Sequence, residues 1–236
     1  MRKRHSIKPN ESRGTIYLIA TPIGNLNDIS YRMVQVLKKV DIVAAEDTRT
    51  ARKLFHHIGL QNMQIRSYYI GNEDRETENL IDLARQGMNI ALITESGTPC
   101  ISDPGFLLVR EAWKYGIKLI PIPGPSAVQL ALIVSGFPSN SYTFLGFLPS
   151  KSTQRRKLIE SLRNSTISTV VFESVHRIQA TLGDFQEILP DREIFIAREL
   201  TKEFETFYKG IAMNILEELV TRKELKGEFT LVIKGA

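Results

Sequence analysis

The residues best suited to chemistry gather in short polar segments that follow apolar runs. The longest is ESGTPCISDPG, residues 95–105, which combines glycines, prolines and hydroxyl groups without lysine or arginine. Glycine lets a backbone approach a ligand closely, and proline stiffens a loop by fixing φ. Such a loop can offer main-chain N–H and C=O groups to a small polar ligand that carries no phosphate. The alternative is a long connection in which Ser102 or Asp103 caps the next helix.

The segment PGPSA, residues 123–127, has two interpretations as well. Ser126 can simply cap the helix that follows, as serine commonly does. Alternatively, Ser126 and Ala127 line a crevice that holds a ligand.

Charged residues of both signs stand together in AAEDTRTARK, residues 44–53. They form a capped, solvated helix start, or else Arg49 and Arg52 hold substrate phosphates while Glu46 or Asp47 deprotonates a hydroxyl. The segment FESVHRI, residues 172–178, contains a similar mixture of charges at the end of an apolar run. The segment RELTKEFE, residues 198–205, is either a salt-bridged face or a substrate wall.

Several function classes lack their signatures. The chain has no G-x-x-x-x-G-K-[ST] phosphate loop, no G-x-G-x-x-G after its first strand and no G-x-S-x-G elbow. Its single cysteine, Cys100, allows no internal disulfide and suits a reducing cytoplasm. His56 and His57 are adjacent and make a poor ligand pair, so we expect no metal site. No apolar run approaches the roughly 20 residues of a membrane helix.

The net charge of +5 is compatible with a polyanionic partner but does not require one. The basic segment 1–13 lacks the apolar stretch of a secretory signal. We interpret it as a flexible, solvated tail, with an arm that touches RNA phosphates as the alternative.

Alternating elements account for the position of the polar segments. Apolar, β-branched runs predict strands at 15–20, 41–46, 65–69, 89–94 and 117–123, with helices between them. Strand–helix alternation predicts a parallel sheet with helices on both faces, and ligands bind such sheets beyond the carboxyl ends of the strands. The loops 21–26, 95–105 and 123–127 all follow predicted strands.

The second half predicts a different α/β lobe. Helices are expected at 126–135, 152–163, 175–189 and 211–222, and a new strand between 135 and 152. Further strands are expected at 167–174, 192–199, 204–210 and 227–233, some of them hairpin neighbours in a mixed sheet. We place the domain boundary near residue 123, giving lobes 14–123 and 124–236.

Eight segments, in order, resemble the tetrapyrrole methylase family. They are GTIYLIATPIGNLNDIS, AAEDTRTARKL, ESGTPCISDPG, IPIPGPSAVQLALIVSGFP, FLGFLP, VVFESVHRI, ARELTKEFE and GEFTLVI, and they extend from about residue 14 to 233. The resemblance implies two α/β lobes, a homodimer and S-adenosylmethionine bound in the cleft between the lobes. Relatives usually have aspartate where this chain has Glu95.

The resemblance also assigns roles to individual residues. By motif, the cofactor contacts are Pro22, Ser96, Gly97, Thr98, Ile101, Ser126, Ala127, Phe172, Leu200 and Phe229. The implied reaction transfers a methyl group to the ribose 2′-oxygen of a cytidine in the decoding region of small-subunit ribosomal RNA.

Deprotonating that hydroxyl calls for a general base. Our candidates are Glu46 or Asp47, with Lys202 and Glu173 as competitors; His176 is a weaker one. The expected substrate contacts are Arg49, Arg52, Arg177 and Lys202. Two alternatives stay open: a tetrapyrrole or protein acceptor for the same cofactor, and an RNA-binding module without cofactor.

Overall fold

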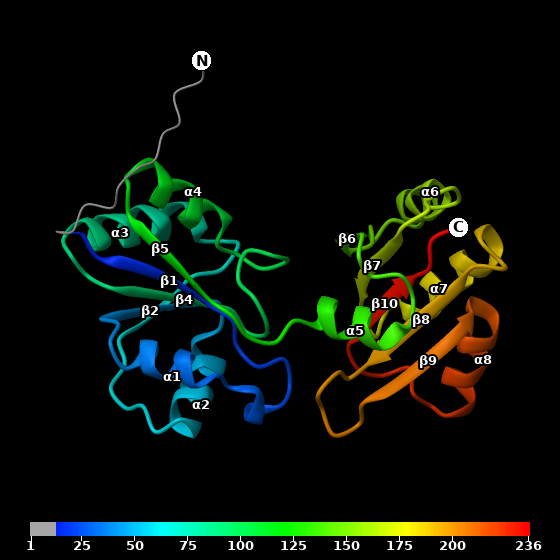
Figure 1. Cartoon of the computed structure of the whole chain (residues 1–236), viewed down its shortest axis with the longest axis horizontal. Coiled ribbons are helices and arrows are strands. Elements are labelled where there is room, and N and C mark those ends of the chain that lie inside the picture. The colour runs from blue at the N-terminus through cyan, green and yellow to red at the C-terminus, as the bar shows by residue number, and fades with distance from the viewer. Residues whose placement is uncertain (1–12) are drawn as a thin grey trace, which may run out of the picture. The chain divides into compact units, whose positions relative to one another are not determined.

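The computed structural model describes residues 13–236, which form two compact units (Figure 1). The first, unit 1, ends at Pro125, and the second, unit 2, begins at Ser126. Most of the predicted basic tail, residues 1–12, lies outside the described residues. Its last residue, Arg13, donates a hydrogen bond to the carbonyl oxygen of Tyr115.

Unit 1 is built on a five-stranded parallel sheet with the strand order β3-β2-β4-β1-β5. Strands β2 and β4 are buried at every position, as expected for strands covered on both faces. The strands are β1 (Thr15–Ile19), β2 (Ile42–Ala45), β3 (Ile65–Ser67), β4 (Ile90–Ile93) and β5 (Lys118–Ile122).

Two pairs of helices cover the opposite faces of this sheet (Figure 1). Helices α1 (Tyr31–Leu37) and α2 (Thr48–His57) pack on one face, and α3 (Glu73–Arg85) and α4 (Phe106–Lys114) on the other. A short 3-10 turn, Leu26–Asp28, precedes α1. Ser30 caps α1 by accepting the N–H of Met33.

The strand order creates a topological switch point between β1 and β4. These strands are neighbours, yet the chain leaves β1 for α1 on one face and leaves β4 for α4 on the other. The two loops therefore leave the sheet toward opposite faces, and doubly wound sheets bind their ligands at such a point, beyond the carboxyl ends of the strands.

Unit 2 contains a mixed five-stranded sheet with the order β6-β7-β10-β8-β9. Strands β6 and β7 are parallel, and the other neighbours are antiparallel. The strands are β6 (Tyr142–Phe147), β7 (Ser168–Glu173), β8 (Glu193–Arg198), β9 (Thr206–Ile211) and β10 (Phe229–Ile233).

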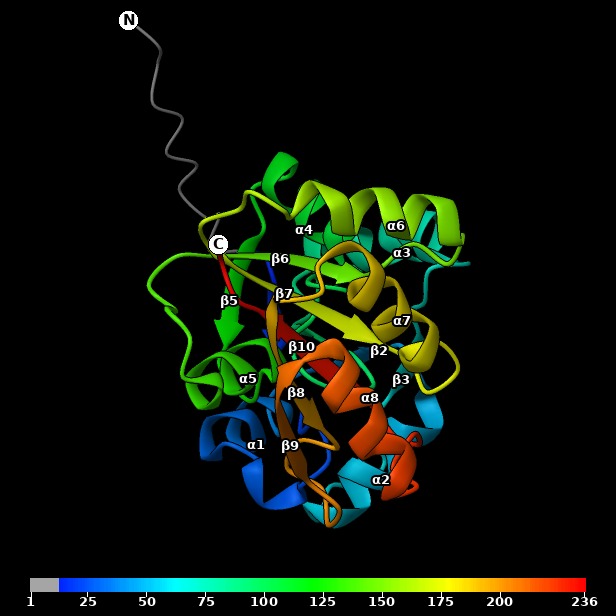
Figure 2. The same ribbon diagram turned by 90° about the vertical axis from the view of Figure 1, so that its right-hand side faces the viewer.

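Four helices surround the mixed sheet (Figure 2). Helix α5 (Ala127–Ser135) packs against β10 and β8. Helices α6 (Ser152–Ser161), α7 (Ile178–Ile188) and α8 (Ala212–Thr221) share one hydrophobic core with inward residues of the strands, such as Val171 and Leu231. The α/β class, with one parallel and one mixed sheet, is thus confirmed.

Candidate functional site

The loops that follow β1 and β4 are joined at the switch point. Thr21 donates its N–H to the carbonyl oxygen of Gly97 at 2.9 Å, and the N–H of Gly97 donates to the carbonyl oxygen of Thr21 at 3.2 Å. The Thr21 hydroxyl also donates to the carbonyl oxygen of Thr94 at 3.3 Å. Both polar main-chain groups of Gly97 are therefore committed within the protein.

The rest of the β4 loop leaves its main-chain donors free. Within the part of the chain that the structure describes, no hydrogen bond uses the N–H groups of Thr98, Cys100, Ile101, Ser102 and Asp103. Backbone donors in folded proteins are nearly always paired with protein or water. The side chains of Ser96, Thr98 and Ile101 are exposed beside them. The segment thus offers a row of donors to a ligand.

The conformation of this loop depends on residues at positive φ. Gly97, Cys100 and Gly105 have φ values of 80°, 68° and 134°. Such values favour glycine, and a non-glycine residue there is strained. Gly105 is buried, occupies the N-cap of α4 and donates its N–H to Glu73 Oε1 at 2.9 Å. This excludes the alternative in which Ser102 or Asp103 caps the helix.

Carboxylates from two loops influence one another beside the free donors. Glu46, directly after β2, accepts the N–H of Glu95 at 3.2 Å. Burial, together with the charges of Glu46 and Glu95, raises the pKa of Asp103 to about 6. The pKa of the Cys100 thiol rises to about 11, chiefly because of burial, which keeps it protonated. The loop thus has an acidic character that suits a cationic ligand.

Asp47 is occupied by its own helix. Its carboxylate caps α2 by accepting the N–H groups of Arg49, at 2.7 Å, and Thr50, at 3.3 Å. It also pairs with the exposed Arg49 guanidinium at 2.7 Å, and this hydrogen bond holds its pKa well below the usual range. A carboxylate engaged in this way is a weak base, so Glu46 is the better of the two predicted candidates.

Unit 2 places Ser126 at the N-cap of α5, but its side chain makes no capping hydrogen bond. Ser126 and Ala127 are half-buried. The simple capping interpretation of this serine is therefore wrong, and its hydroxyl stays available for another partner.

The aromatic candidates of unit 2 differ in accessibility. Phe172 is half-buried and makes edge contacts with Phe144 and Phe147, at ring-centroid distances of 5.0 and 5.6 Å. Leu200 is buried, and Phe229 belongs to the hydrophobic core with 2% of its surface exposed. Within unit 2, the Phe229 side chain therefore serves packing.

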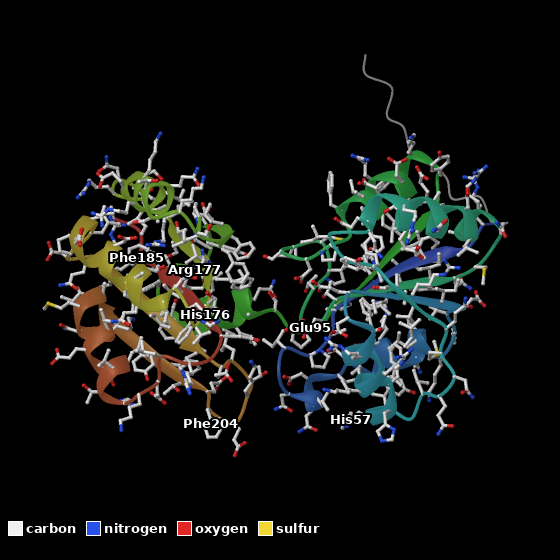
Figure 3. The ribbon with its side chains drawn as sticks, turned by 180° about the vertical axis from the view of Figure 1, so that it is seen from behind. His57, Glu95, His176, Arg177, Phe185 and Phe204 are labelled. Atoms are coloured by element: carbon white, nitrogen blue, oxygen red, sulfur yellow. The ribbon has the colours of Figure 1, made fainter. Side chains whose placement is uncertain are left out.

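Arg177, just before α7 (Figure 3), is half-buried and forms an ion pair with the buried Glu173 at the end of β7. Arg177 approaches Glu173 at 2.8 Å and donates a second bond to the carbonyl oxygen of Leu148 at 2.8 Å. Glu173 is fully buried and also accepts the Thr181 hydroxyl and the Ser174 N–H, each at 2.7 Å. Both residues have structural partners, which argues against Arg177 as a phosphate contact and Glu173 as a base. His176 beside them is exposed.

The segment after β8 is strained and contains Lys202. The ammonium group of Lys202 pairs with Glu199 at 3.0 Å and Glu228 at 3.1 Å, which fits the salt-bridged interpretation of this segment. Glu199 and Thr201 have φ values of 53° and 65°. The buried Thr201 hydroxyl oxygen has no hydrogen-bond partner among the described residues. Backbone strain of this kind is found at functional sites.

Two negative findings apply to residues 13–236. No group of three or more His, Cys, Asp or Glu side chains there is arranged to hold a metal ion. None of the helices in this range has the length and apolar character required to span a membrane.

The comparison with protein families decides the class of the molecule. The model for Tetrapyrrole (Corrin/Porphyrin) Methylases matches residues 15–215. The chain belongs to the tetrapyrrole methylase family. This match covers both units and includes the switch-point loops described above.

Known members of this family resemble the chain along nearly its full length. It is 42% identical to a ribosomal RNA small subunit methyltransferase I from Halalkalibacterium halodurans, covering all of this chain and 81% of that protein. It is 43% identical to the protein of the same name from Xylella fastidiosa, covering 94% of this chain and 82% of that protein.

The fold agrees with a solved member of the tetrapyrrole methylases. The uroporphyrin-III C-methyl transferase from Thermus thermophilus, complexed with S-adenyl homocysteine, superposes with a TM-score of 0.59 at 14% identity. That match covers 93% of this chain and 97% of the solved chain. The solved structure shows the fold of the chain, and the family match with the two relatives shows that it is a methyltransferase.

Sequence reasoning missed several residues at the candidate site. Thr21 joins the loops through its backbone bonds with Gly97 and its hydroxyl bond to the carbonyl oxygen of Thr94, and no sequence pattern indicates that pairing. Asp103 entered the sequence analysis only as one of two alternative helix caps, but its charge is influenced by Glu46 and Glu95, which come from separate positions in the chain. The only available signal was that these acids follow strands of one parallel sheet.

Proposed function

We propose that this chain is an S-adenosylmethionine-dependent enzyme that methylates the ribose 2′-oxygen of a cytidine in small-subunit ribosomal RNA. The central support is the loop after β4, which has free main-chain donors, acidic neighbours and no lysine or arginine between residues 95 and 105. The names of the relatives from H. halodurans and X. fastidiosa support the RNA acceptor.

The residues after β1 and β4 fit the proposed cofactor. The free N–H groups from Thr98 to Asp103 can bind its carboxylate and ribose oxygens, and the acids favour its positive charge. S-adenosylmethionine supplies an electrophilic methyl group on a sulfonium. The side chains of Ser96, Thr98 and Ile101 are exposed for contact. Pro22, Ser126, Ala127, Phe172 and Leu200 remain predicted contacts.

The chain's own contribution to chemistry is to place and deprotonate the acceptor hydroxyl. Glu46 is half-buried, and the Glu95 N–H fixes the orientation of its carboxylate. A positioned base of this kind contributes on the order of 10²–10⁴ in rate. We therefore assign Glu46 as the general base and Asp47 as the residue that fixes the start of α2.

Arg49 is our first candidate for contact with RNA phosphate. Its side chain is 84% exposed and pairs only with Asp47 among the described residues, at the start of α2 beside Glu46. Arg49→Ala is expected to weaken binding to small ribosomal subunits about 10-fold at low salt and to reduce the salt slope by about one. Calorimetric affinity for S-adenosylhomocysteine should stay unchanged.

The control for Arg49→Ala is Arg85→Ala on α3, which removes an arginine that is 50% exposed and pairs with Asp82. Filter binding at several salt concentrations measures both variants. Equal loss in the two variants, or none in Arg49→Ala, would rule out a specific phosphate contact.

The raised pKa of Asp103 predicts a pH dependence of cofactor binding. A cation close to Asp103 lowers its pKa, so binding releases a proton and affinity rises with pH from about 5 to 7. Asp103→Asn should flatten this profile in a calorimetric titration. S-adenosylhomocysteine, which lacks the sulfonium charge, should show a smaller pH effect than S-adenosylmethionine. A wild-type affinity independent of pH would contradict this prediction.

The raised pKa of Asp103 gives folding stability the opposite pH dependence to cofactor binding. The folded state binds the Asp103 proton more tightly than the unfolded chain, so this group favours folding most strongly at low pH. That contribution fades as pH rises from 3.8, the ordinary pKa, to about 6.

Transfer of a tritiated methyl group tests the proposed function directly. Small ribosomal subunits from cells that lack this gene should accept label, and mapping should locate it on a ribose 2′-oxygen. If the label appears on a tetrapyrrole or a protein instead, that molecule and not ribosomal RNA is the methyl acceptor. Absence of any thermal shift with S-adenosylhomocysteine would favour an RNA-binding module without cofactor.

We also propose that the enzyme acts as a homodimer in the cytoplasm. The family resemblance suggests the dimer, and a ribosomal RNA acceptor requires access to ribosomes or their precursors. Sedimentation of the purified chain at micromolar concentration measures the oligomeric state.

A further inference from the structure

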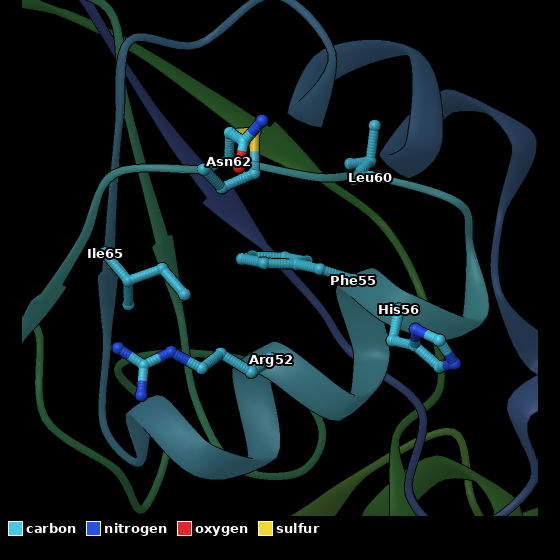
Figure 4. Close-up of a pocket in the computed structure, with 7 residues that line it drawn as sticks. Arg52, Phe55, His56, Leu60, Asn62 and Ile65 are labelled. Carbon is cyan, nitrogen blue, oxygen red and sulfur yellow. The ribbon is translucent and has the colours of Figure 1, made fainter.

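A small cavity lies between α2 and the segment that leads from α2 to β3, apart from the β1 and β4 loops (Figure 4). Its volume is about 260 Å³, slightly below the range of roughly 300–1,000 Å³ that is typical of drug-sized ligands. The lining residues are Arg52, Phe55, His56, Leu60, Asn62, Met63 and Ile65. The space therefore suits a single flat ring system better than a whole cofactor.

The chemistry of the lining is divided between an apolar floor and a polar rim. Phe55, Leu60, Met63 and Ile65 supply the apolar surface, and Arg52, His56 and Asn62 supply the polar groups. Phe55 lies at the centre, with Arg52 on one side of its ring and Leu60 and Asn62 on the other (Figure 4). Nucleobases combine an apolar face with polar edges, and a pocket of this composition matches both features.

Asn62 is held at the rim in an unusual conformation. Its φ of 59° lies in the left-handed region, its side chain is exposed, and no hydrogen bond among the described residues uses its amide. An amide with both donor and acceptor atoms can pair with the edge of a base. The backbone thus presents a free recognition group beside the apolar floor.

A row of basic side chains along α2 leads from the candidate site to this cavity. Arg49, Arg52, Lys53 and His56 recur at helical spacing on one face, and all are exposed. Within residues 13–236, no salt bridge involves Arg52, Lys53 or His56. The row starts next to Glu46, and at 1.5 Å per residue it extends about 10 Å along the helix. Its charge is complementary to a phosphodiester backbone.

We infer that α2 carries a single-stranded stretch of RNA and that the cavity receives one unstacked base near the methylated nucleotide. This inference rests on the proposed function and adds a second point of recognition to it. Arg52 and His56 contact the phosphates that flank this base. Leu60, Met63 and Ile65 contact its face, and the Asn62 amide binds its edge.

Steady-state methyl transfer to small subunits from cells lacking the gene tests this inference. Asn62→Gly removes the amide and suits the positive φ, and Arg52→Gln removes the charge without shortening the side chain. Each is expected to raise KM for subunits on the order of 10-fold, with kcat, melting temperature and S-adenosylhomocysteine affinity unchanged. Lys38→Gln, an exposed lysine at the end of α1, is the matched control.

Ultraviolet cross-linking of the wild-type complex supplies an independent measurement. A nucleotide linked to the peptide that contains Phe55 or Met63 supports the inference. A KM equal to that of Lys38→Gln, an effect confined to kcat, or a link from these peptides to a ribosomal protein would overturn it. If the wild-type enzyme labels no ribosomal RNA, the proposed function itself fails, which is a separate result.

Discussion

Gly105→Ala is expected to destabilise unit 1 and to abolish detectable binding of S-adenosylhomocysteine. At φ 134°, an alanine Cβ would stand 2.6 Å from Cys100 Sγ and 2.7 Å from Leu92 Cδ2. Backbone strain and overpacking each cost about 1–3 kcal/mol. Because Gly105 ends the loop that carries the free donors, relief of this clash must displace the loop.

Urea denaturation and calorimetry measure the two effects of this substitution. Gly59→Ala is the control, because Gly59 also has a positive φ, 70°, but a Cβ there would meet nothing within 4 Å. It should show the backbone cost alone and retain cofactor affinity. Wild-type affinity in Gly105→Ala would show that the loop after β4 does not hold the cofactor.

Arg177→Ala is expected to lower the free energy of unfolding of unit 2 by about 3–5 kcal/mol. The substitution leaves the fully buried Glu173 carboxylate without its cation, although Thr181 and Ser174 still donate to it. It also removes the donor to the Leu148 carbonyl oxygen. Denaturation monitored by circular dichroism measures the loss.

Adding Glu173→Gln to this variant should restore part of the stability, because the neutral amide can accept the Ser174 N–H with its oxygen and donate its NH₂ group to the Thr181 hydroxyl. If Arg177→Ala instead keeps the unfolding free energy of the wild type and loses affinity for ribosomal subunits, Arg177 is a substrate contact and not a structural residue.

Most helices and strands of both units could be predicted from the sequence, because the spacing of apolar residues and the positions of glycines are local signals. Strand β4, for example, is a continuous apolar run between Asn89 and the polar loop, and all four of its residues are buried. The predicted ends differ from the observed ones by a few residues. The short 3-10 turn Leu26–Asp28 was not predicted, because a segment of three residues is too short to show a periodic pattern of apolar residues.

The site was only partly predictable, because its decisive contacts join residues far apart in the chain. The polar loop 95–105 was correctly located beyond a strand, but the bond between Gly97 and Thr21 could not be inferred. Arg177 was predicted to contact the substrate, and its partners Leu148 and Glu173 become evident only in the folded unit 2. A capped helix start was already one interpretation of the segment that contains Asp47, and the structure shows Asp47 as that cap.

The paired amides of Thr21 and Gly97 fasten two diverging loops at one point. An insertion between either strand end and this pair of residues would shift Thr21 relative to Gly97 and break their pairing. An insertion farther out in the loop would leave the pairing intact. On the β1 side, changes in length are thereby confined to the outer segment, residues 24–28. New acceptors can be accommodated by remodelling this segment, while the backbone at the strand ends and the loop after β4 retain their geometry.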